Sequence, residues 1–97
     1  MRLKKEYIEI IKKITKEYFG ENAEVFLFGS RVDDSKRGGD IDLYIETQMK
    51  ENLIESKIKM LGKLHKEIGE QKIDIVINSF EKDKYIFQVA KSEGILL

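Results

Sequence analysis

The sequence predicts an α+β fold in which a small sheet is covered by helices. Amphipathic segments with apolar residues at three- and four-residue intervals predict the helices, and short β-branched or aromatic runs predict the strands. These segments follow in the order helix, strand, strand, helix, strand, helix, with no repeat or low-complexity stretch between them. A chain of 97 residues has room for one domain with a small core, so we expect a single domain over residues 1–97.

The first helix is predicted over residues 3–19. Its apolar residues are separated by Lys and Glu at helical spacing, and Gly20 provides a C-terminal stop. The short run Val25-Phe26-Leu27-Phe28 follows and is wholly apolar. Such a run is typical of a strand that is covered on both faces.

The second half of the chain contains the remaining elements. Residues 29–39 are polar and Gly-containing and predict a loop, whereas residues 40–46 alternate strictly and predict a strand with two unlike faces. A second amphipathic helix is closed by Gly69, and a third strand covers residues 73–77. We expect the apolar residues of this helix to face the core: Leu53, Ile54, Ile58, Leu61, Leu64 and Ile68.

The C-terminal segment predicts one more helix. Asn78 with Glu81 three residues later forms a capping box, and Gly94 ends the helix. Residues 95–97 are apolar and predict a short terminal strand.

The composition excludes several classes of function. Lys+Arg and Asp+Glu balance at 18 each, which gives no general attraction to nucleic acid or to an anionic membrane. The chain has no cysteine, so disulfides and Cys-based zinc sites are excluded. No apolar run is long enough to span a bilayer and no signal-peptide pattern opens the chain, so a cytoplasmic location is expected.

Three carboxylates predict a metal site. Asp40 and Asp42 lie two apart in a strand, so both side chains leave the same face with Cα atoms roughly 6.6 Å apart. Asp74 lies in an apolar strand, where a lone carboxylate is costly unless something pairs with it. If the two strands are neighbours, Asp40, Asp42 and Asp74 form a cluster of hard oxygen ligands suited to Mg²⁺ or Mn²⁺. Two such ions about 3.5–4 Å apart would clamp the attacking and leaving oxygens of a phosphoryl displacement.

Gly29 and Ser30 predict a phosphate-binding turn. They follow a buried strand directly, glycine lets a phosphate approach the backbone, and Ser30 can cap a helix that begins near Arg31. Amide groups at such a helix start bind terminal phosphates. Arg31 adds positive charge, either as a phosphate contact or as a surface residue.

Together these motifs resemble a known family. Gly29-Ser30, nine intervening residues, Asp40-Ile41-Asp42 and then Asp74 in a later strand are similar to the polymerase-beta-like nucleotidyltransferase superfamily. The sequence more closely resembles its minimal members, the MNT proteins, which are often paired as antitoxins with HEPN-domain proteins. Its Gly-Ser to carboxylate spacer is one residue shorter than in antitoxin-type members.

The resemblance implies the nucleotidyltransferase fold, a small mixed sheet flanked by helices. It implies that Asp40 and Asp42 bind two metal ions and that Asp74 completes the site and orients or activates the acceptor hydroxyl. Gly29, Ser30 and Arg31 would bind the nucleotide. The expected reaction transfers a nucleoside monophosphate, AMP from ATP, to an acceptor hydroxyl such as a tyrosine of a HEPN toxin, with which the chain would form a hetero-oligomer.

Alternative functions remain open at the level of sequence. A binding module could neutralise a partner by contact alone, whereas a small-molecule transferase would need a further domain to shape its pocket. Taken singly, each motif is more often structural than catalytic. Tyr44 shares the Asp42 face and either contacts substrate or is partly buried beside the site, Glu46 is expected to be solvated at the strand end, and His65 is expected to pack at a boundary.

Overall fold

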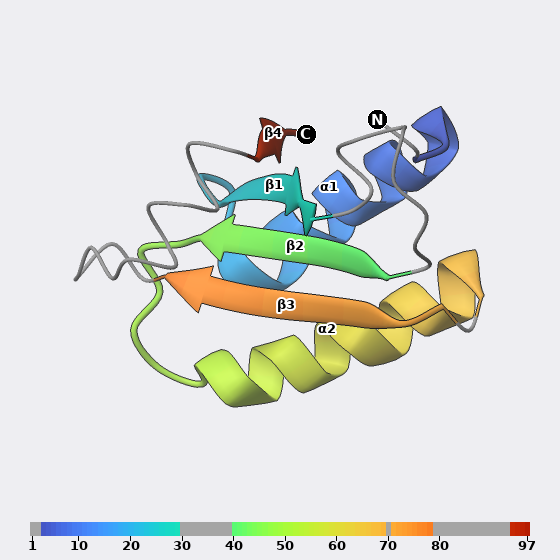
Figure 1. Cartoon of the computed structure of the whole chain (residues 1–97). Coiled ribbons are helices and arrows are strands. Elements are labelled where there is room, and N and C mark those ends of the chain that lie inside the picture. The colour runs from blue at the N-terminus through green and yellow to red at the C-terminus, as the bar shows by residue number, and fades with distance from the viewer. Residues whose placement is uncertain (1–2, 30–39, 70, 79–93) are drawn as a thin grey trace.

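The computed structural model describes residues 3–29, 40–69, 71–78 and 94–97 of the chain (Figure 1). Two helices and four strands lie in this part of the protein. They are α1 (Lys5–Phe19), β1 (Glu24–Phe28), β2 (Ile41–Glu46), α2 (Leu53–Ile68), β3 (Ile73–Asn78) and β4 (Ile95–Leu96). The helix predicted after Asn78 lies outside the described residues.

The four strands form one mixed sheet in the order β3-β2-β1-β4. Strand β2 runs parallel to β3 and antiparallel to β1, and β4 pairs antiparallel with the other edge of β1. Parallel neighbours need a crossover connection, and α2 provides it between β2 and β3. The predicted fold class, α+β with a small mixed sheet flanked by helices, is confirmed.

Helices α1 and α2 cover one face of the sheet (Figure 1). Alternate strand residues point to that face, and Leu27, Leu43 and Ile75 are buried beneath the helices. Helix α1 contributes Ile11 and Ile14 to the same core. Each such aliphatic side chain contributes about 1.5–3 kcal/mol on burial, so this layer supplies most of the hydrophobic stabilisation.

A buried hydrogen bond ties the end of β2 to the end of α1. The hydroxyl of Thr47 donates to the carbonyl oxygen of Phe19 at 2.6 Å, and the Thr47 side chain is fully buried. An exposed ion pair also joins the two helices, with the Lys63 ammonium 3.0 Å from the Glu17 carboxylate. The helical layer is therefore anchored to the sheet at the end of β2.

The buried face of α2 differs from the predicted one. Met60, Leu64 and Ile68 face the core, but Ile54 and Ile58 are 76% and 64% exposed. The prediction that Ile54 and Ile58 belong to the core is therefore wrong. The apolar pattern of α2 combines two stripes, and only the stripe that faces the sheet is covered.

No helix within the described ranges is both long enough and apolar enough to cross a membrane.

Candidate functional site

The second face of the sheet carries the predicted carboxylates. Strands β2 and β3 are neighbours, and Asp42 is the register partner of Asp74. Side chains of paired residues in neighbouring strands leave the same face from Cα atoms on the order of 5 Å apart. Asp40 comes one residue before β2 and lies on the same side as Asp42 by the two-residue alternation. Asp40 and Asp42 are half-buried, whereas Asp74 is exposed.

These carboxylates repel one another. The pKa of Asp42 is raised above its ordinary value of 3.8, first by burial and then by the charges of Asp74 and Asp40. The Lys72 ammonium acts in the opposite direction and lowers the pKa of Asp42. A site that holds several carboxylates close together favours either a proton or a bound cation.

Lys72 partly supplies this positive charge. Its Nζ atom lies 3.6 Å from Oδ2 of Asp40, with 71% of the Lys72 side chain exposed. The Lys72 carbonyl accepts a hydrogen bond from the backbone N–H of Ile41 at 2.9 Å, which fixes Lys72 beside the start of β2. Lys72 is not among the site residues predicted from the sequence. The signal was a basic residue two positions before Asp74, on the same side of an extended chain.

Gly29 closes the site on the β1 side. It follows directly after Phe28, the register partner of Asp42, and has a φ of +80°. A Cβ atom built on Gly29 would overlap Oδ2 of Asp42, so any other residue must displace this carboxylate. The backbone after β1 therefore lies against the Asp42 side chain. The predicted nucleotide-binding residues Ser30 and Arg31 lie outside the described residues.

The far end of the same face holds a buried polar network. The Tyr44 hydroxyl donates to Oε1 of Glu46 at 3.2 Å and accepts from Nδ2 of Asn78 at 3.0 Å. Its ring packs against Phe26 with centroids 5.6 Å apart, and the Tyr44 side chain is fully buried. The prediction that Glu46 is solvated is wrong, because Glu46 is only 5% exposed. Glu46 lies opposite Asn78 in the parallel pairing of β2 with β3, where hydrogen bonds within this network take the place of hydrogen bonds to water.

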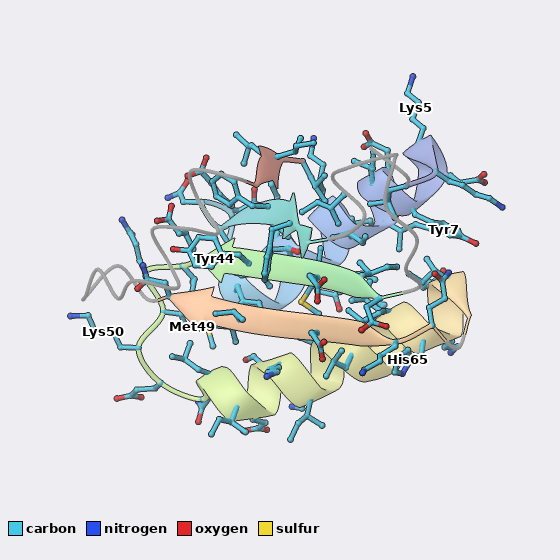
Figure 2. The ribbon with its side chains drawn as sticks, in the orientation of Figure 1. Lys5, Tyr7, Tyr44, Met49, Lys50 and His65 are labelled. Atoms are coloured by element: carbon cyan, nitrogen blue, oxygen red, sulfur yellow. The ribbon has the colours of Figure 1, made fainter. Side chains whose placement is uncertain are left out.

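His65 lies apart from the carboxylates. It is exposed at the C-terminal end of α2 (Figure 2), and its Nε2 atom lies 3.1 Å from the carbonyl oxygen of Gln71. This contact links the end of α2 to the segment before β3. His65 was expected to pack at a boundary, but its side chain is exposed and makes this polar contact instead.

The carboxylates fit a divalent cation by their chemistry. Asp42 and Asp74 offer hard oxygen ligands side by side, and burial together with the charges of Asp74 and Asp40 raises the pKa of Asp42. Across the ranges that the structure describes, however, no three His, Asp or Glu side chains are arranged to hold one ion together. Asp40 is turned to Lys72 instead. The pair Asp42–Asp74 is thus the part of the predicted metal site that the described geometry brings together.

Comparison with known proteins agrees with the motif. Residues 8–97 match the family model described as the nucleotidyltransferase domain, whereas no curated protein matches the chain. Domains of that family carry out nucleotidyl transfer on nucleotide substrates and generally use divalent metal ions. Because the match covers nearly the whole chain, including every described strand, this protein belongs to the nucleotidyltransferase domain family.

Proposed function

We propose that this chain transfers a nucleoside monophosphate from a nucleoside triphosphate, with ATP as the expected donor, to an acceptor hydroxyl. The observation that supports this most directly is the register pairing of Asp42 with Asp74 on the sheet face opposite the helices. Gly29, the first residue of the predicted phosphate-binding turn, brings its backbone close to the same carboxylate. We treat residues 1–97 as one catalytic domain.

In this proposal Asp40, Asp42 and Asp74 hold a divalent cation, Mg²⁺ or Mn²⁺, with two ions expected. When bound, the cation neutralises charge on the triphosphate and acidifies the acceptor hydroxyl. Asp42 and Asp74 are already adjacent, and Asp40 would bind the cation in place of the Lys72 ammonium. The exposed Lys72 side chain is free to move away because its contact with Asp40 is at the surface.

The transfer itself forms one bond and breaks one. The acceptor oxygen bonds to the α-phosphorus, and the bond from that phosphorus to the oxygen of the departing pyrophosphate breaks. Asp74, the most exposed of the three carboxylates, accepts the hydroxyl proton on a carboxylate oxygen. Gly29, Ser30 and Arg31 hold the triphosphate tail. The chain needs no covalent intermediate, because positioning and charge stabilisation account for catalysis of this kind.

For the acceptor we propose a tyrosine hydroxyl on a HEPN-domain partner, which would make the chain an antitoxin that modifies its partner in the cytoplasm. This proposal is supported by the resemblance of the Gly29-Ser30 and Asp40-Ile41-Asp42 motifs to the minimal members of the superfamily. A contact-only binding module is the second candidate. One observation favours it: Asp40 pairs with Lys72 and leaves no three-carboxylate cluster in the described residues.

The test follows label from α-³²P-ATP with Mg²⁺ into the proteins and small molecules of a lysate from the source cells. Asp42→Asn and Asp74→Asn run beside the native chain, with Glu21→Gln as a matched control at an exposed acid away from the site. We expect label with the native chain and with Glu21→Gln, and none with the two Asn variants. The acceptor is then identified by mass.

A different result would change the assignment. No label from any of the four nucleoside triphosphates, with folded protein, would support the contact-only module. Label that enters a small molecule would support the transferase activity and would show that the acceptor is not a protein. Label retained by Asp42→Asn would contradict the carboxylate site itself.

A further inference from the structure

Strand β3 forms one edge of the sheet and directs backbone hydrogen-bonding groups away from it. Its single neighbour in the sheet is β2. The N–H of Ile41 donates to the carbonyl oxygen of Lys72, and backbone groups point alternately to the two sides along a strand, so those of Ile73, Ile75 and Ile77 face away from β2. Among the residues that the structure describes, none bonds to these outward groups, which we call the β3 edge.

The β3 edge lacks the features that commonly prevent an edge strand from pairing. Such strands are often very short or carry proline or lysine. Strand β3 is six residues long, reads IDIVIN and contains neither proline nor lysine. Its one charged side chain, Asp74, belongs to the candidate site. The backbone of β3 can therefore accept one more strand.

The exposed apolar stripe of α2 lies on the flank of the helix next to the β3 edge. Ile54 and Ile58 are 76% and 64% exposed, and half-buried Leu61 continues the stripe. His65 follows Ile58 by seven residues, on the same side of the helix. Because Nε2 of His65 lies 3.1 Å from the carbonyl oxygen of Gln71, just before β3, this side of α2 faces the β3 edge.

The opposite flank of α2 faces α1, as the ion pair between Lys63 and Glu17 indicates. Helix α2 runs alongside β3 in the opposite direction (Figure 1). The seven residues from His65 back to Ile58 cover about 10 Å of helix, which is the length of about three strand residues. Counted from Gln71, Ile58 therefore lies about level with Asp74 along the strand.

We propose that the acceptor protein binds the β3 edge as an extended segment, which adds a strand beside β3 and places its hydroxyl next to Asp74. This inference rests on the proposed transfer and adds the conformation and chemistry of the acceptor. A residue opposite Asp74 would direct its side chain to the carboxylate face, with its Cβ atom about 5 Å from that of Asp74. The residues before and after it would point to the helical side and pack on Ile58 and Leu61. The acceptor segment is thus a hydroxyl residue between two apolar ones.

The two features together favour an extended segment over other occupants. A helix could cover Ile54 and Ile58 but could not bond to the outward backbone groups of β3. The other side of the site is closed, because the backbone at Gly29 lies against Asp42, so an acceptor approaches the carboxylates from the β3 side. Lys57, half-buried on α2, can direct its ammonium to water while its stem packs beside the stripe.

Binding of a synthetic peptide to the full chain tests this docking without any reaction. The probe is a fluorescent nonapeptide with a central Tyr between two Val residues, Thr at the next positions and Lys at the ends, and a second version has Phe in place of Tyr. Anisotropy is followed as metal-free protein is added up to the millimolar range. We expect both peptides to bind, and Ile58→Ser to weaken binding by about tenfold or more. Leu96→Ser, at an apolar side chain 53% exposed on β4, is the matched control and should bind like the native chain.

Methylation of the peptide backbone tests strand addition itself. One peptide is N-methylated at the central Tyr and another at both neighbouring Val residues. In an added strand alternate amides face β3, so one of these peptides should lose binding and the other should keep it. Loss with methylated Tyr indicates a parallel strand, and loss with methylated Val indicates an antiparallel one. Equal loss or equal retention would overturn the proposal, as would the absence of binding.

The label-transfer assay separates this inference from the proposed function. Transfer from ATP to a lysate protein that Ile58→Ser leaves unchanged would support the transferase and overturn docking at the β3 edge. Peptide binding with the expected methylation pattern, but no label in any acceptor, would support the docking surface and count against the transferase. A chain that binds no peptide but dimerises, with dimerisation lost in Ile58→Ser, would assign the edge to a second copy and overturn the proposal.

Discussion

Gly29 and Asp42 lie so close together that residue 29 has no room for a side chain. A Cβ atom on residue 29 would overlap the Asp42 carboxylate, and the backbone there has a φ of +80°. Two independent features of this position thus select glycine: a left-handed backbone and contact with a carboxylate. Gly69 has a φ of +88° but no neighbour within 4 Å of an added Cβ, so it shares only the first feature.

Comparing variants of Gly69 and Gly29 separates the effect of backbone strain from the effect of the contact with Asp42. Gly69→Ala should cost about 1–2 kcal/mol of unfolding free energy through backbone strain alone and should retain nucleotidyl transfer. Gly29→Ala should cost at least as much and should also lower transfer by about 100-fold or more, because it displaces Asp42. Urea denaturation and the label-transfer assay measure the two quantities. Equal activity of both variants would show that the Gly29–Asp42 contact has no role in the reaction.

The charged Asp42 carboxylate should destabilise the folded protein, although nucleotidyl transfer requires it. Burial, Asp74 and Asp40 raise its pKa above 3.8, so the folded protein holds this proton more tightly than the unfolded chain does. The contribution of Asp42 to the free energy of unfolding therefore falls as the pH rises through the window between 3.8 and the raised pKa. Asp42→Asn removes the charge, so at neutral pH we expect a higher thermal midpoint than in the native chain. In acid the difference between the two proteins should shrink.

Asp42→Asn should also reduce transfer by about 10³-fold or more, because loss of a metal ligand removes several kcal/mol of charge stabilisation. Thermal unfolding of the metal-free protein at pH 3 and pH 7, and label transfer with Mg²⁺ at pH 7, test the two expectations. A lower midpoint for Asp42→Asn at pH 7 would contradict the expectation that the Asp42 charge destabilises the folded protein. Retained transfer would contradict its assignment as a ligand.

Much of the fold follows from periodicity, whereas the strand order does not. The alternation of residues 40–46 and the spacing around Asp74 predict two strands, but the prediction that their carboxylates cluster depends on the strands being neighbours. Adjacency of β2 and β3 is a tertiary property that local patterns do not contain. Lys72 was missed for the same reason. Its place beside Asp40 depends on the backbone hydrogen bond from the Ile41 N–H to the Lys72 carbonyl oxygen, which joins the two strands.

Burial was predicted less well than secondary structure. Helical spacing identifies α2 but does not say which of two apolar stripes faces the sheet, so Ile54 and Ile58 were misplaced. A strand end is usually solvated, so Glu46 was expected in water. The parallel pairing that places Asn78 opposite Glu46, and Tyr44 beside both, could not be read from the sequence.

Lys72 should compete with the cation for Asp40. Its ammonium lies 3.6 Å from the Asp40 carboxylate and lowers the pKa of Asp42. Lys72→Met should therefore raise the pKa of Asp42 further in the metal-free protein. It should also lower the Mg²⁺ concentration for half-maximal transfer by a factor of a few, because an exposed ion pair is worth about 1 kcal/mol or less. Carboxyl NMR titration and a Mg²⁺ series measure the two effects.

Lys63→Met is the matched control for Lys72→Met. It removes an exposed ion pair with Glu17 on the helical side of the molecule, away from Asp42. We expect no change in the Asp42 titration or in the Mg²⁺ requirement. If Lys72→Met instead raised the Mg²⁺ requirement, Lys72 would have to bind substrate phosphate and not compete with the cation.

The buried hydroxyl of Tyr44 should matter for stability. It donates to Glu46 and accepts from Asn78 in a site where all three side chains are buried. Tyr44→Phe keeps the ring packed on Phe26 but removes both hydrogen bonds from buried polar partners. We expect a loss of about 1–3 kcal/mol of unfolding free energy, which corresponds to a fall in thermal midpoint on the order of 5–15 °C. Tyr7→Phe, at a half-buried ring on α1, is the control and should change the midpoint little. Because Tyr44 lies on the same strand as Asp42, an unchanged midpoint combined with lost transfer would assign its hydroxyl to the reaction and not to the fold.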